Sequence, residues 1–475
     1  VTRFTYDASH RMLTMTDPRN GVVTNVYDAS GRVTVQSDPL NRATTFAYSG
    51  DNTSAAGGTT TITDPKGNVT LEQYQGMTLV AVTHGAGTAS AATWRYTYDP
   101  ATLGITSVTD PNVHVTKRTY DANGNVLTST DALNRQTVFT YDSLNDVRTI
   151  TDPKNVTTTL VYDAQGNLQS RSRPLLGGGS AQTQLTTYHY GDPAHPGDVT
   201  SMTDPDTQTW TYTYDADGNQ TSVTDPLHDQ TTYGFNAIGW LTSATSPKLA
   251  VTTFAHTPFG DVTTTTDPLG DQTVRHYDPN RNLDQSTDGN MNVTKYAYDA
   301  ANELTVVTRA DGTTLQTDYY PDGTVFHQYD GKHNATTYAY DPLARPVSVA
   351  DPLGRATRAA YDGAGNLLTV TDAQGQTTTY GYDAANEVTA IAYSDGKTPN
   401  VTAIQYDADG QRTGMTDGTG TSAWGYDSLN RLTSSTDGAG ATVGYGYDLK
   451  GQLTNMTYPG NLAVARAYDA AGRLH

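Results

Sequence analysis

The sequence predicts an all-β fold made of tandem antiparallel hairpins, and three observations carry this prediction. A Tyr-Asp pair recurs along the 475-residue chain, mostly at a spacing of 21 residues or a multiple of it. Each copy holds two turn signals, separated by short runs rich in Thr, Val and Tyr, which favour strands. No stretch keeps a helical periodicity over three turns. A repeat with two short strands and two tight turns is a β-hairpin.

The Tyr-Asp pair sets the phase of the whole array. In this phase it occurs at Tyr6, Tyr27, Tyr98, Tyr120, Tyr141, Tyr162, Tyr214, Tyr277, Tyr298, Tyr340, Tyr361, Tyr382, Tyr406, Tyr426, Tyr447 and Tyr468. Positions with degenerate copies fill the gaps, namely Tyr48, Tyr74, Tyr190, Phe235, His256 and Tyr319. Together they give 22 registers, and chance does not keep such a phase over so many copies.

One complete copy, residues 120–140, shows why each repeated residue type is present. Asp121 can accept backbone N–H groups two residues on, and Gly124 supplies a positive φ. The second turn usually reads Asp-Pro, as at Asp267-Pro268, because proline presets φ and cannot donate to a strand ladder. The register tyrosine is expected to bury its ring and leave its hydroxyl at a wet edge. The structural repeat residues are represented by Tyr120, Asp121, Gly124, Tyr162, Asp163, Gly166, Tyr361, Asp362 and Gly365.

We expect residues 1–475 to form a single continuous array of about 22 repeats, truncated at both ends. The chain begins at Val1 and stops at His475, each in the middle of a repeat, so we expect a piece of a longer polypeptide. Stretches rich in Gly, Ser, Ala and Thr predict exposed loop insertions near residues 49–61, 83–93, 174–184 and 392–404.

Composition favours a thin sheet and excludes several classes of function. Hydrophobic residues make up only 35% of the chain, although 32 evenly spread Tyr argue against disorder. The formal net charge of −20 and the lack of any basic run argue against nucleic-acid binding. The absence of Cys excludes disulfides and thiolate metal sites. No apolar stretch reaches the roughly 18 residues that a membrane-spanning helix needs.

A sheet made of so many hairpins must wrap. Roughly 44 strands at about 4.8 Å each would make a flat sheet about 200 Å wide. Open twisted sheets rarely exceed about ten strands, so we expect a spiral in which each turn protects the strand edges of the next. A β-propeller stays open as an alternative, because its period of about 40 residues equals two of these repeats. A parallel β-helix lacks the paired tight turns.

The registers Tyr162-Asp163-Ala164-Gln165-Gly166-Asn167-Leu168 and Tyr361-Asp362-Gly363-Ala364-Gly365-Asn366-Leu367 resemble the RHS or YD-repeat proteins. The resemblance covers essentially the whole chain. It implies a β-sheet strip spiralled into a hollow shell, in a secreted or cell-surface protein. In bacterial polymorphic toxins and insecticidal toxin complexes such a shell encloses a C-terminal toxin, and in teneurins it is part of an adhesion receptor.

One feature of the family is missing from these residues. Members with cargo end the shell in an autoproteolytic segment that contains aspartate, marked by an Asp-Pro-x-Gly-Leu-like boundary. Here Asp271 follows Asp267-Pro268-Leu269-Gly270, and Arg355 follows Asp351-Pro352-Leu353-Gly354. Both segments are in phase as ordinary turns, so neither self-cleavage nor a toxin is carried over to them.

The acidic residues are best interpreted as turn residues. Most Asp occupy the two fixed turn positions, which favours a structural role over a catalytic carboxylate pair. Residues 215–219 and 407–410 imitate the start of a calcium loop, but the distal Glu that such a loop requires is missing from both. We therefore predict no metal site.

Other candidate groups also have structural interpretations. His189, His195 and His256 lack metal-ligand spacing, and residues 177–179 lack the Lys that follows a phosphate-binding loop. The tryptophans fall where an aromatic residue belongs in or near a strand, so packing is favoured over sugar binding: Trp94, Trp210, Trp240 and Trp424. We predict no catalytic residue, no cofactor and no enzymatic activity.

Two functional hypotheses follow. The first is a structural shell segment that walls off or supports cargo, such as a toxin, carried elsewhere in the parent polypeptide. The second is an adhesion or carbohydrate-binding module whose partners are glycans or cell-surface proteins. An adhesin would cluster aromatic residues in its loops, whereas the insertions hold almost none beyond Tyr74 and Trp94. This favours the shell, and a hydrolase on a β-helix is the third interpretation.

Overall fold

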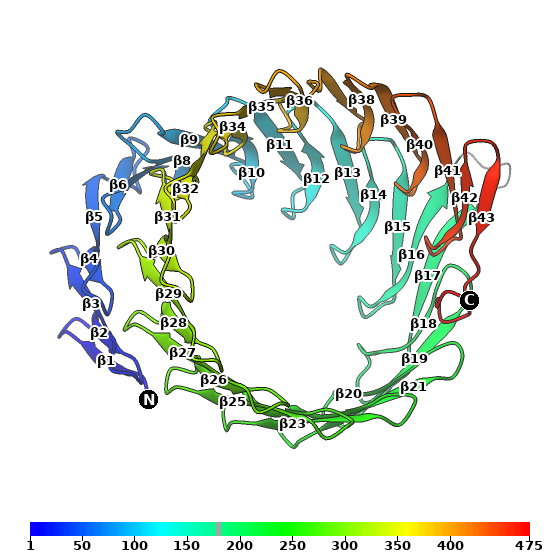
Figure 1. The fold of residues 1–475 in the computed structure, drawn as a ribbon, viewed down its shortest axis with the longest axis horizontal. Coiled ribbons are helices and arrows are strands. Elements are labelled where there is room, and N and C mark those ends of the chain that lie inside the picture. Colours follow the sequence, from blue (N-terminus) through cyan, green and yellow to red (C-terminus); the bar gives the residue numbers. More distant parts are fainter. Residues whose placement is uncertain (177–181) are drawn as a thin grey trace. The chain divides into compact units, whose positions relative to one another are not determined.

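The computed structural model describes residues 1–176 and 182–475. These residues form 43 β-strands and no helix, which confirms the all-β prediction (Figure 1). The tip of the predicted insertion at 174–184, with its glycines at 177–179, lies outside the described residues. Within the described chain, no helix is long and apolar enough to cross a membrane.

The strands are short, mostly of five or six residues. The first twelve are β1 (Arg3–Tyr6), β2 (Met12–Thr16), β3 (Val22–Tyr27), β4 (Val33–Ser37), β5 (Ala43–Gly50), β6 (Gly58–Thr63), β7 (Val69–Gln75), β8 (Thr78–His84), β9 (Ala92–Tyr98), β10 (Ile105–Thr109), β11 (Val115–Tyr120) and β12 (Val126–Thr130). The next twelve are β13 (Gln136–Tyr141), β14 (Val147–Thr151), β15 (Thr157–Tyr162), β16 (Leu168–Leu175), β17 (Gln182–Tyr190), β18 (Val199–Thr203), β19 (Thr209–Tyr214), β20 (Gln220–Thr224), β21 (Gln230–Phe235), β22 (Leu241–Thr245), β23 (Val251–His256) and β24 (Val262–Thr266).

The same pattern continues to the end of the chain. The next twelve strands are β25 (Gln272–Tyr277), β26 (Leu283–Thr287), β27 (Val293–Tyr298), β28 (Leu304–Thr308), β29 (Thr314–Tyr319), β30 (Val325–Tyr329), β31 (Ala335–Tyr340), β32 (Pro346–Ala350), β33 (Ala356–Tyr361), β34 (Leu367–Thr371), β35 (Thr377–Tyr382) and β36 (Val388–Tyr393). The last seven are β37 (Ala403–Tyr406), β38 (Arg412–Asp417), β39 (Gly420–Tyr426), β40 (Leu432–Thr436), β41 (Thr442–Tyr447), β42 (Leu453–Tyr458) and β43 (Leu462–Ala465).

Strands that follow one another in the sequence pair antiparallel, as in β11–β12, β12–β13 and β13–β14. The pairing gives a sheet of 36 strands, β1 to β36, and a second sheet of seven strands, β37 to β43. The sequence predicted one long sheet, and the structure divides it after β36. The division falls in the segment 394–402, where a single bridge joins Ile391 to Val401 in place of a strand ladder.

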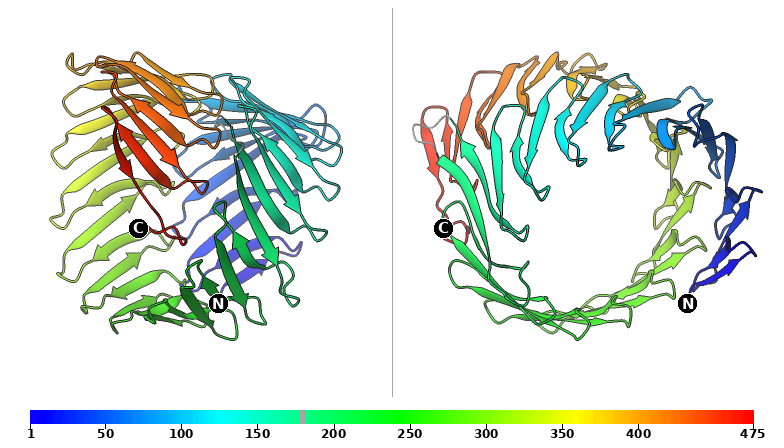
Figure 2. Two further views of the ribbon diagram at one scale, coloured as in Figure 1. Left: turned by 90° about the vertical axis from the view of Figure 1, so that its right-hand side faces the viewer. Right: turned by 180° about the vertical axis from the view of Figure 1, so that it is seen from behind.

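The chain separates into two compact units, each made of an early and a late part of the sequence. Unit 1 contains Val1–Thr97, Val108–Val113 and Phe254–Thr377. Unit 2 contains Tyr98–Ser107, His114–Thr253 and Thr378–His475. Within unit 1, the early strands, drawn in blue, lie beside late strands drawn in green to yellow (Figure 2).

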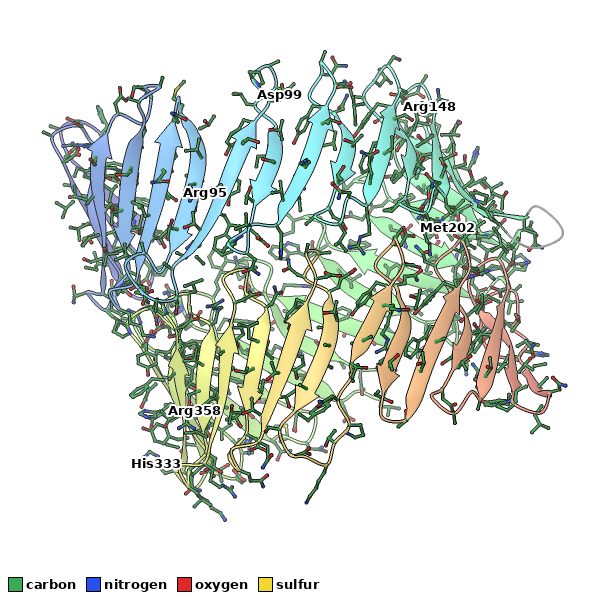
Figure 3. All side chains as sticks on the ribbon, turned by 90° about the horizontal axis from the view of Figure 1, so that it is seen from above. Arg95, Asp99, Arg148, Met202, His333 and Arg358 are labelled. Atoms are coloured by element: carbon green, nitrogen blue, oxygen red, sulfur yellow. The ribbon has the colours of Figure 1, made fainter. Side chains whose placement is uncertain are left out.

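The two turns of each repeat lie at opposite edges of the strip of strands. We call the edge formed by turns that follow the register tyrosine, such as 121–125, the Tyr edge. The edge formed by the other turns, such as 131–135, is the Pro edge. Side chains leave both faces of the strip, and Figure 3 labels Asp99 in a Tyr-edge turn and His333 in a Pro-edge turn. A β-bulge at Thr119/Tyr120 shifts the register next to the Tyr edge.

The same hydrogen bonds close the turns at both edges. Asp121 Oδ1 accepts the backbone N–H groups of Asn123 and Asn125, each at 2.9 Å. Asp131 Oδ1 accepts those of Leu133 and Arg135 at the same distance. The fourth turn residue has a positive φ, 87° at Gly124 and 64° at Asn134. A carboxylate that accepts two donors satisfies backbone groups that a tight turn leaves unpaired.

The register tyrosines join neighbouring hairpins. The Tyr141 hydroxyl donates to the backbone carbonyl of Val126 at 2.8 Å, and that of Tyr120 donates to Ile105 at 2.8 Å. The sequence analysis did not foresee these acceptors, which the hydroxyls meet because each ring reaches back across the preceding hairpin. A Cβ added at Gly104 would come within 2.6 Å of the Tyr120 ring, which explains the glycine there.

Burial is shallow throughout the described residues. Only six hydrophobic residues are buried there, and no large side chain is fully buried. The strip is stabilised mainly by backbone ladders, turn carboxylates and tyrosine hydrogen bonds, because it has too few buried apolar side chains to form a thick core.

Removing the Asp121 carboxylate should loosen its hairpin. In Asp121→Ala, we expect the Asn125 amide to exchange with deuterium about tenfold faster, because its acceptor is gone. The effect should reach only adjoining hairpins, as nearest-neighbour stability in repeat arrays requires. Asn123→Ala, in the same turn, is the matched control, and equal exchange in both variants would contradict the role of the carboxylate.

Removing one tyrosine hydroxyl should also be measurable. Tyr141→Phe leaves the Val126 carbonyl without its donor and should lower the free energy of unfolding by about 1 kcal/mol. Tyr233→Phe is the control, since its hydroxyl has no hydrogen bond to any described residue. Denaturant unfolding followed by circular dichroism would measure both, and no difference between the two variants would contradict the proposed link between hairpins.

Candidate functional site: the seams between strip edges

In each unit, the Pro edge of the early part of the strip lies against the Tyr edge of the late part. We call this line of contact the seam. In unit 1, its best-defined contact joins the Pro-edge turn 38–42 to the Tyr-edge turn 299–303. Arg42 Nη1 donates to both carboxylate oxygens of Glu303, at 3.1 and 2.9 Å. Arg42 Nε also donates to Asp38 Oδ2 of its own turn, so one guanidinium spans both edges.

The Arg42–Glu303 pair is well shielded from solvent. The two side chains are only 18% and 17% exposed. Burial raises the pKa of the Glu303 carboxyl, and the hydrogen bond from Arg42 only partly offsets this. Breaking such a pair from one side leaves a poorly solvated charge, which costs more than losing a pair on an open surface.

A second contact of unit 1 holds a lysine between an aspartate and two aromatic rings. Lys66 Nζ lies 3.3 Å from Asp322 Oδ2. It also lies 4.0 Å from the ring centroid of Tyr320 and 5.4 Å from that of Tyr340. Burial acts to raise the pKa of Asp322, but hydrogen bonds from Thr324 and the charge of Lys66 outweigh it and lower that pKa. The lysine is therefore held by charge and by the faces of the rings.

Further polar contacts continue the seam in both directions. Arg19 Nη2 donates to the backbone carbonyl of Tyr298 at 2.8 Å, and its Nη1 donates to Asn302 at 3.1 Å. At the other end of the seam, Asn112 donates to Asp362 Oδ2 at 2.8 Å. The seam of unit 1 therefore runs over several turns.

Unit 2 repeats this chemistry with different residues. Arg135 Nη1 donates to both carboxylate oxygens of Glu387, at 2.9 and 3.0 Å, and its Nε pairs with Asp131. Lys154 Nζ lies 2.9 Å from Asp407 Oδ2 and 3.8 Å from Asp409 Oδ2. Burial raises the pKa of Glu387, again partly offset by its arginine.

The polarity of the charges reverses toward the end of the unit 2 seam. There the Tyr edge supplies the cations and the Pro edge the carboxylates. Lys450 Nζ lies 3.1 Å from Asp204, and Arg473 Nη1 lies 2.8 Å from Asp229. Cations and carboxylates still meet one another across the seam.

Partners across the seams stand at a nearly constant distance in the sequence. The separation is 261 residues for Arg42–Glu303, 252 for Arg135–Glu387 and 244 for Arg473–Asp229. Twelve repeats of 21 residues make 252. A Pro-edge turn begins about ten residues into its repeat, so its Tyr-edge partner twelve registers later is expected about 242 residues on, and insertions lengthen the separation from there.

The structural repeat residues predicted from the sequence lie in Tyr-edge turns or next to them. Tyr162, whose pKa is raised by burial, precedes Asp163, which accepts the backbone N–H groups of Gln165 and Asn167. The Tyr361 hydroxyl donates to the Pro346 carbonyl at 3.0 Å. Gly124, Gly166 and Gly365 have φ values of 87°, 85° and 99°. Among the predicted aspartates, Asp362 lies in a seam, whereas Asp121 and Asp163 bond within their own turns.

The other groups weighed in the sequence have local partners. Asp215 Oδ1 accepts the N–H groups of Asp217 and Asn219. His195 Nδ1 lies 3.5 Å from Asp192. Nowhere in residues 1–176 and 182–475 do three or more His, Cys, Asp or Glu side chains gather so that they could hold a metal ion.

Two shallow clefts of unit 1 lie away from the Arg42–Glu303 contact. One, of about 350 Å³, is lined by His84 and Trp94, which meet edge to face, and by the 342–345 turn across the seam. The other, of about 580 Å³, lies over β28 to β31, with Thr317 and Gln328 in its lining. Neither cleft brings an acid, a base and a nucleophile together.

The sequence analysis missed the seam cations and the glutamates alike, although the glutamates carried a signal. The chain has only three, Glu72, Glu303 and Glu387, among 49 acidic residues. Two of the three take part in matching seam contacts. A residue type that is rare in the chain yet in phase with its repeat was the available signal.

Comparisons with known proteins bear on the repeat and on the fold. The family model described as RHS Repeat matches residues 120–154, 141–175, 197–230, 214–249, 361–398 and 406–442. No curated protein sequence matches the chain.

Solved structures share the fold, and three of them show how far the likeness extends. The crystal structure of TcdB2-TccC3-Cdc42 covers 100% of this chain with a TM-score of 0.70 and 16% identity, and that of TcdB2-TccC3-TEV covers 100% with 0.69 and 13%. A Tc holotoxin pore from Photorhabdus luminescens covers 98% with 0.67 and 14%. This chain spans only 28%, 32% and 29% of those chains. At these identities the likeness is one of fold.

Stability should depend on pH mainly through the turn carboxylates. A hydrogen bond from the Asn125 side chain and bonds from backbone amides lower the pKa of Asp121 below its ordinary 3.8, and similar bonds lower that of Asp163. A lowered folded-state pKa gives stability that is present above the ordinary pKa and lost as pH falls through the folded value. We therefore expect the melting temperature to fall below about pH 4.

The seam glutamates should act in the opposite sense. Their pKa values lie above the ordinary 4.5, so proton uptake favours the folded state as pH falls through them. Glu303→Gln with Glu387→Gln should remove this small gain and leave the loss in stronger acid in place. Melting curves from about pH 7 to 3 test both statements, and a clear loss of stability already at about pH 6 would contradict them.

Proposed function

We propose, because this chain belongs to the RHS-repeat family, that it is a wall segment of an RHS-type shell that encloses or supports cargo carried elsewhere in the parent polypeptide. The observation that carries the proposal is the pair of seams. The Pro edge of the strip docks on the Tyr edge of the same strip about twelve repeats later, so each edge protects the other from solvent and from other chains. This is what a wall needs, and a binding module does not require it.

The chemistry of the strip supports a structural role. The turn carboxylates are occupied by backbone amides, the seam cations pair with carboxylates, and the register tyrosine hydroxyls that bond across hairpins are donors to backbone carbonyls. A catalytic site would need out-of-phase polar residues that converge in a cleft. We therefore propose that the segment is not an enzyme and that it forms one continuous array over residues 1–475.

The likeness to chains named in Tc toxin structures supports the cargo part of the proposal by analogy of fold. We propose a toxin as the cargo and a secreted or cell-surface location for the parent protein. Adhesion to glycans is the competing function, and the cleft beside Trp94 is the one observation that favours it, because an aromatic ring can stack on a sugar.

The test compares proteolysis of the full gene product with that of a version lacking residues 1–475. If the segment is a wall, the remaining sequence should resist trypsin about tenfold longer when the wall is present. Equal cleavage in the two proteins would contradict enclosure. Glycan-array binding by the isolated segment that Trp94→Ala abolishes, together with equal cleavage, would establish adhesion in its place.

A further inference from the structure

A seam between near-identical repeats faces a problem of register. Every turn at one edge resembles its neighbours, so a slip of one repeat would bring equivalent turns together. The turn hydrogen bonds cannot oppose such a slip, because Asp121 and Asp131 bond within their own turns whatever faces them. Alignments are distinguished only where the facing residues differ, as for strands in a sheet.

The glutamates differ from their neighbours in the right place. Glu303 and Glu387 are each the fifth residue of a Tyr-edge turn, in two segments that both read Tyr-Asp-Ala-Ala-Asn-Glu. That position holds Asn125, Asn167 or Arg345 in other turns. Asp146 and Asp261 place a shorter carboxylate there in two further turns. A glutamate at this position therefore distinguishes two Tyr-edge turns from the rest.

Their partners are also matched to each other. Arg42 and Arg135 are each the fifth residue of a Pro-edge turn, and both follow Leu-Asn. Both use Nη1 to reach the two glutamate oxygens and Nε to hold the aspartate of their own turn. The same three-residue arrangement thus occurs once in each unit, in different repeats.

We propose that the Arg42–Glu303 and Arg135–Glu387 pairs set the register of the two seams. They are specificity-determining contacts that select one alignment of the edges from a series shifted by whole repeats. This inference concerns how the strip docks on itself and is independent of what the strip encloses.

The Pro edge could shift by one repeat toward higher residue numbers of the Tyr edge. Such a slip would lose the arginine–glutamate pairs and would bring like charges together. Arg42 would face Thr324 in place of Glu303, and the carboxylate of that turn, Asp322, stands at the third turn position and not at the fifth. Lys66 would face the turn of Arg345, and Lys154 that of Arg431, so like charges would approach. Specificity of this kind comes from penalties on wrong alignments as well as from the correct pair.

In a slip of one repeat toward lower residue numbers, only the arginines lose their glutamate partners, because the lysines gain them. Arg42 would then face Asn282, while Lys66 would take its place beside Glu303. In unit 2, Lys154 would likewise move beside Glu387. Arg42→Glu with Arg135→Glu should therefore favour this one slip. In the observed register each new carboxylate would repel its glutamate partner, whereas in the slipped register a lysine would lie beside that glutamate.

The absence of Cys makes the register readable by cross-linking. A Cβ on Gly363 would lie 2.7 Å from Pro111 Cβ across the unit 1 seam, so the two turns need to part by about 1 Å to reach the disulfide separation of about 3.8 Å. Pro111→Cys with Gly363→Cys therefore reports the observed register. Pro111→Cys with Pro342→Cys, 21 residues earlier, reports a slip of one repeat toward lower numbers.

In the otherwise unchanged chain we expect a disulfide only from the first cysteine pair. Arg42→Glu with Arg135→Glu should raise the ratio of slipped to correct disulfide at least about tenfold, as a difference of 1.4 kcal/mol would. Adding Glu303→Arg and Glu387→Arg should restore the original ratio, because the pairs re-form with reversed charge and the lysines are then repelled. Glu72→Gln is the control and should change nothing.

A ratio unchanged by the arginine reversals in a folded protein would overturn the proposal. The proposal would also be overturned if the variant with all four charges reversed gave the same ratio of slipped to correct disulfide as the variant with only the two arginines reversed. If the doubly reversed chain does not fold by circular dichroism, the fourfold reversal must restore folding, and its failure to do so would equally refute the inference.

Discussion

Most turns of the strip depend on one aspartate carboxylate that accepts two backbone N–H groups, and Asn236 and Thr257 supply the accepting oxygen in two others. In the turns of Asp121 and Asp131, the aspartate Oδ1 accepts the backbone N–H groups of the third and fifth turn residues. The first of these turns lies on the Tyr edge and the second on the Pro edge. Because both edges use the same device, the chain reverses direction every ten or eleven residues without a core to force it. Strand length, edge position and the phase of the tyrosines follow from that spacing.

A sheet with so little buried apolar surface needs other sources of cohesion. Hydroxyl groups of register tyrosines supply one, since Tyr141 ties its hairpin to the carbonyl of Val126 in the preceding one. The seams supply another, as the exposure of equivalent leucines in unit 1 shows. Leu40, in a docked Pro-edge turn, is 39% exposed, whereas Leu269 and Leu353 are 89% and 77% exposed. Docking of the edges thus buries apolar surface that a single strip leaves in water.

The features predictable from the sequence are those that act within one repeat. The hairpins follow from Asp121 and Gly124, whose effects reach only four residues along the chain. The partner of the Tyr141 hydroxyl was not predictable, because it lies 15 residues back on another hairpin. The Arg42–Glu303 contact spans 261 residues and depends on how many repeats separate the docked edges, which no local pattern encodes. The division after β36 was missed because the sequence of the insertion at 392–404 looks the same whether the strands on its two sides pair or not.

The two kinds of residue in this chain therefore have different roles. Residues in phase with the repeat, such as Asp121 and Tyr141, build any number of hairpins and carry no information about which hairpin meets which. Residues whose type departs from that of other copies at the same turn position, such as Glu303 and Lys66, contribute little to their own hairpins and distinguish one repeat from another. A chain with only the first kind could form a strip with many equivalent dockings. The rare charges are what give such a strip one preferred docking, at the cost of burying ion pairs that apolar residues could replace.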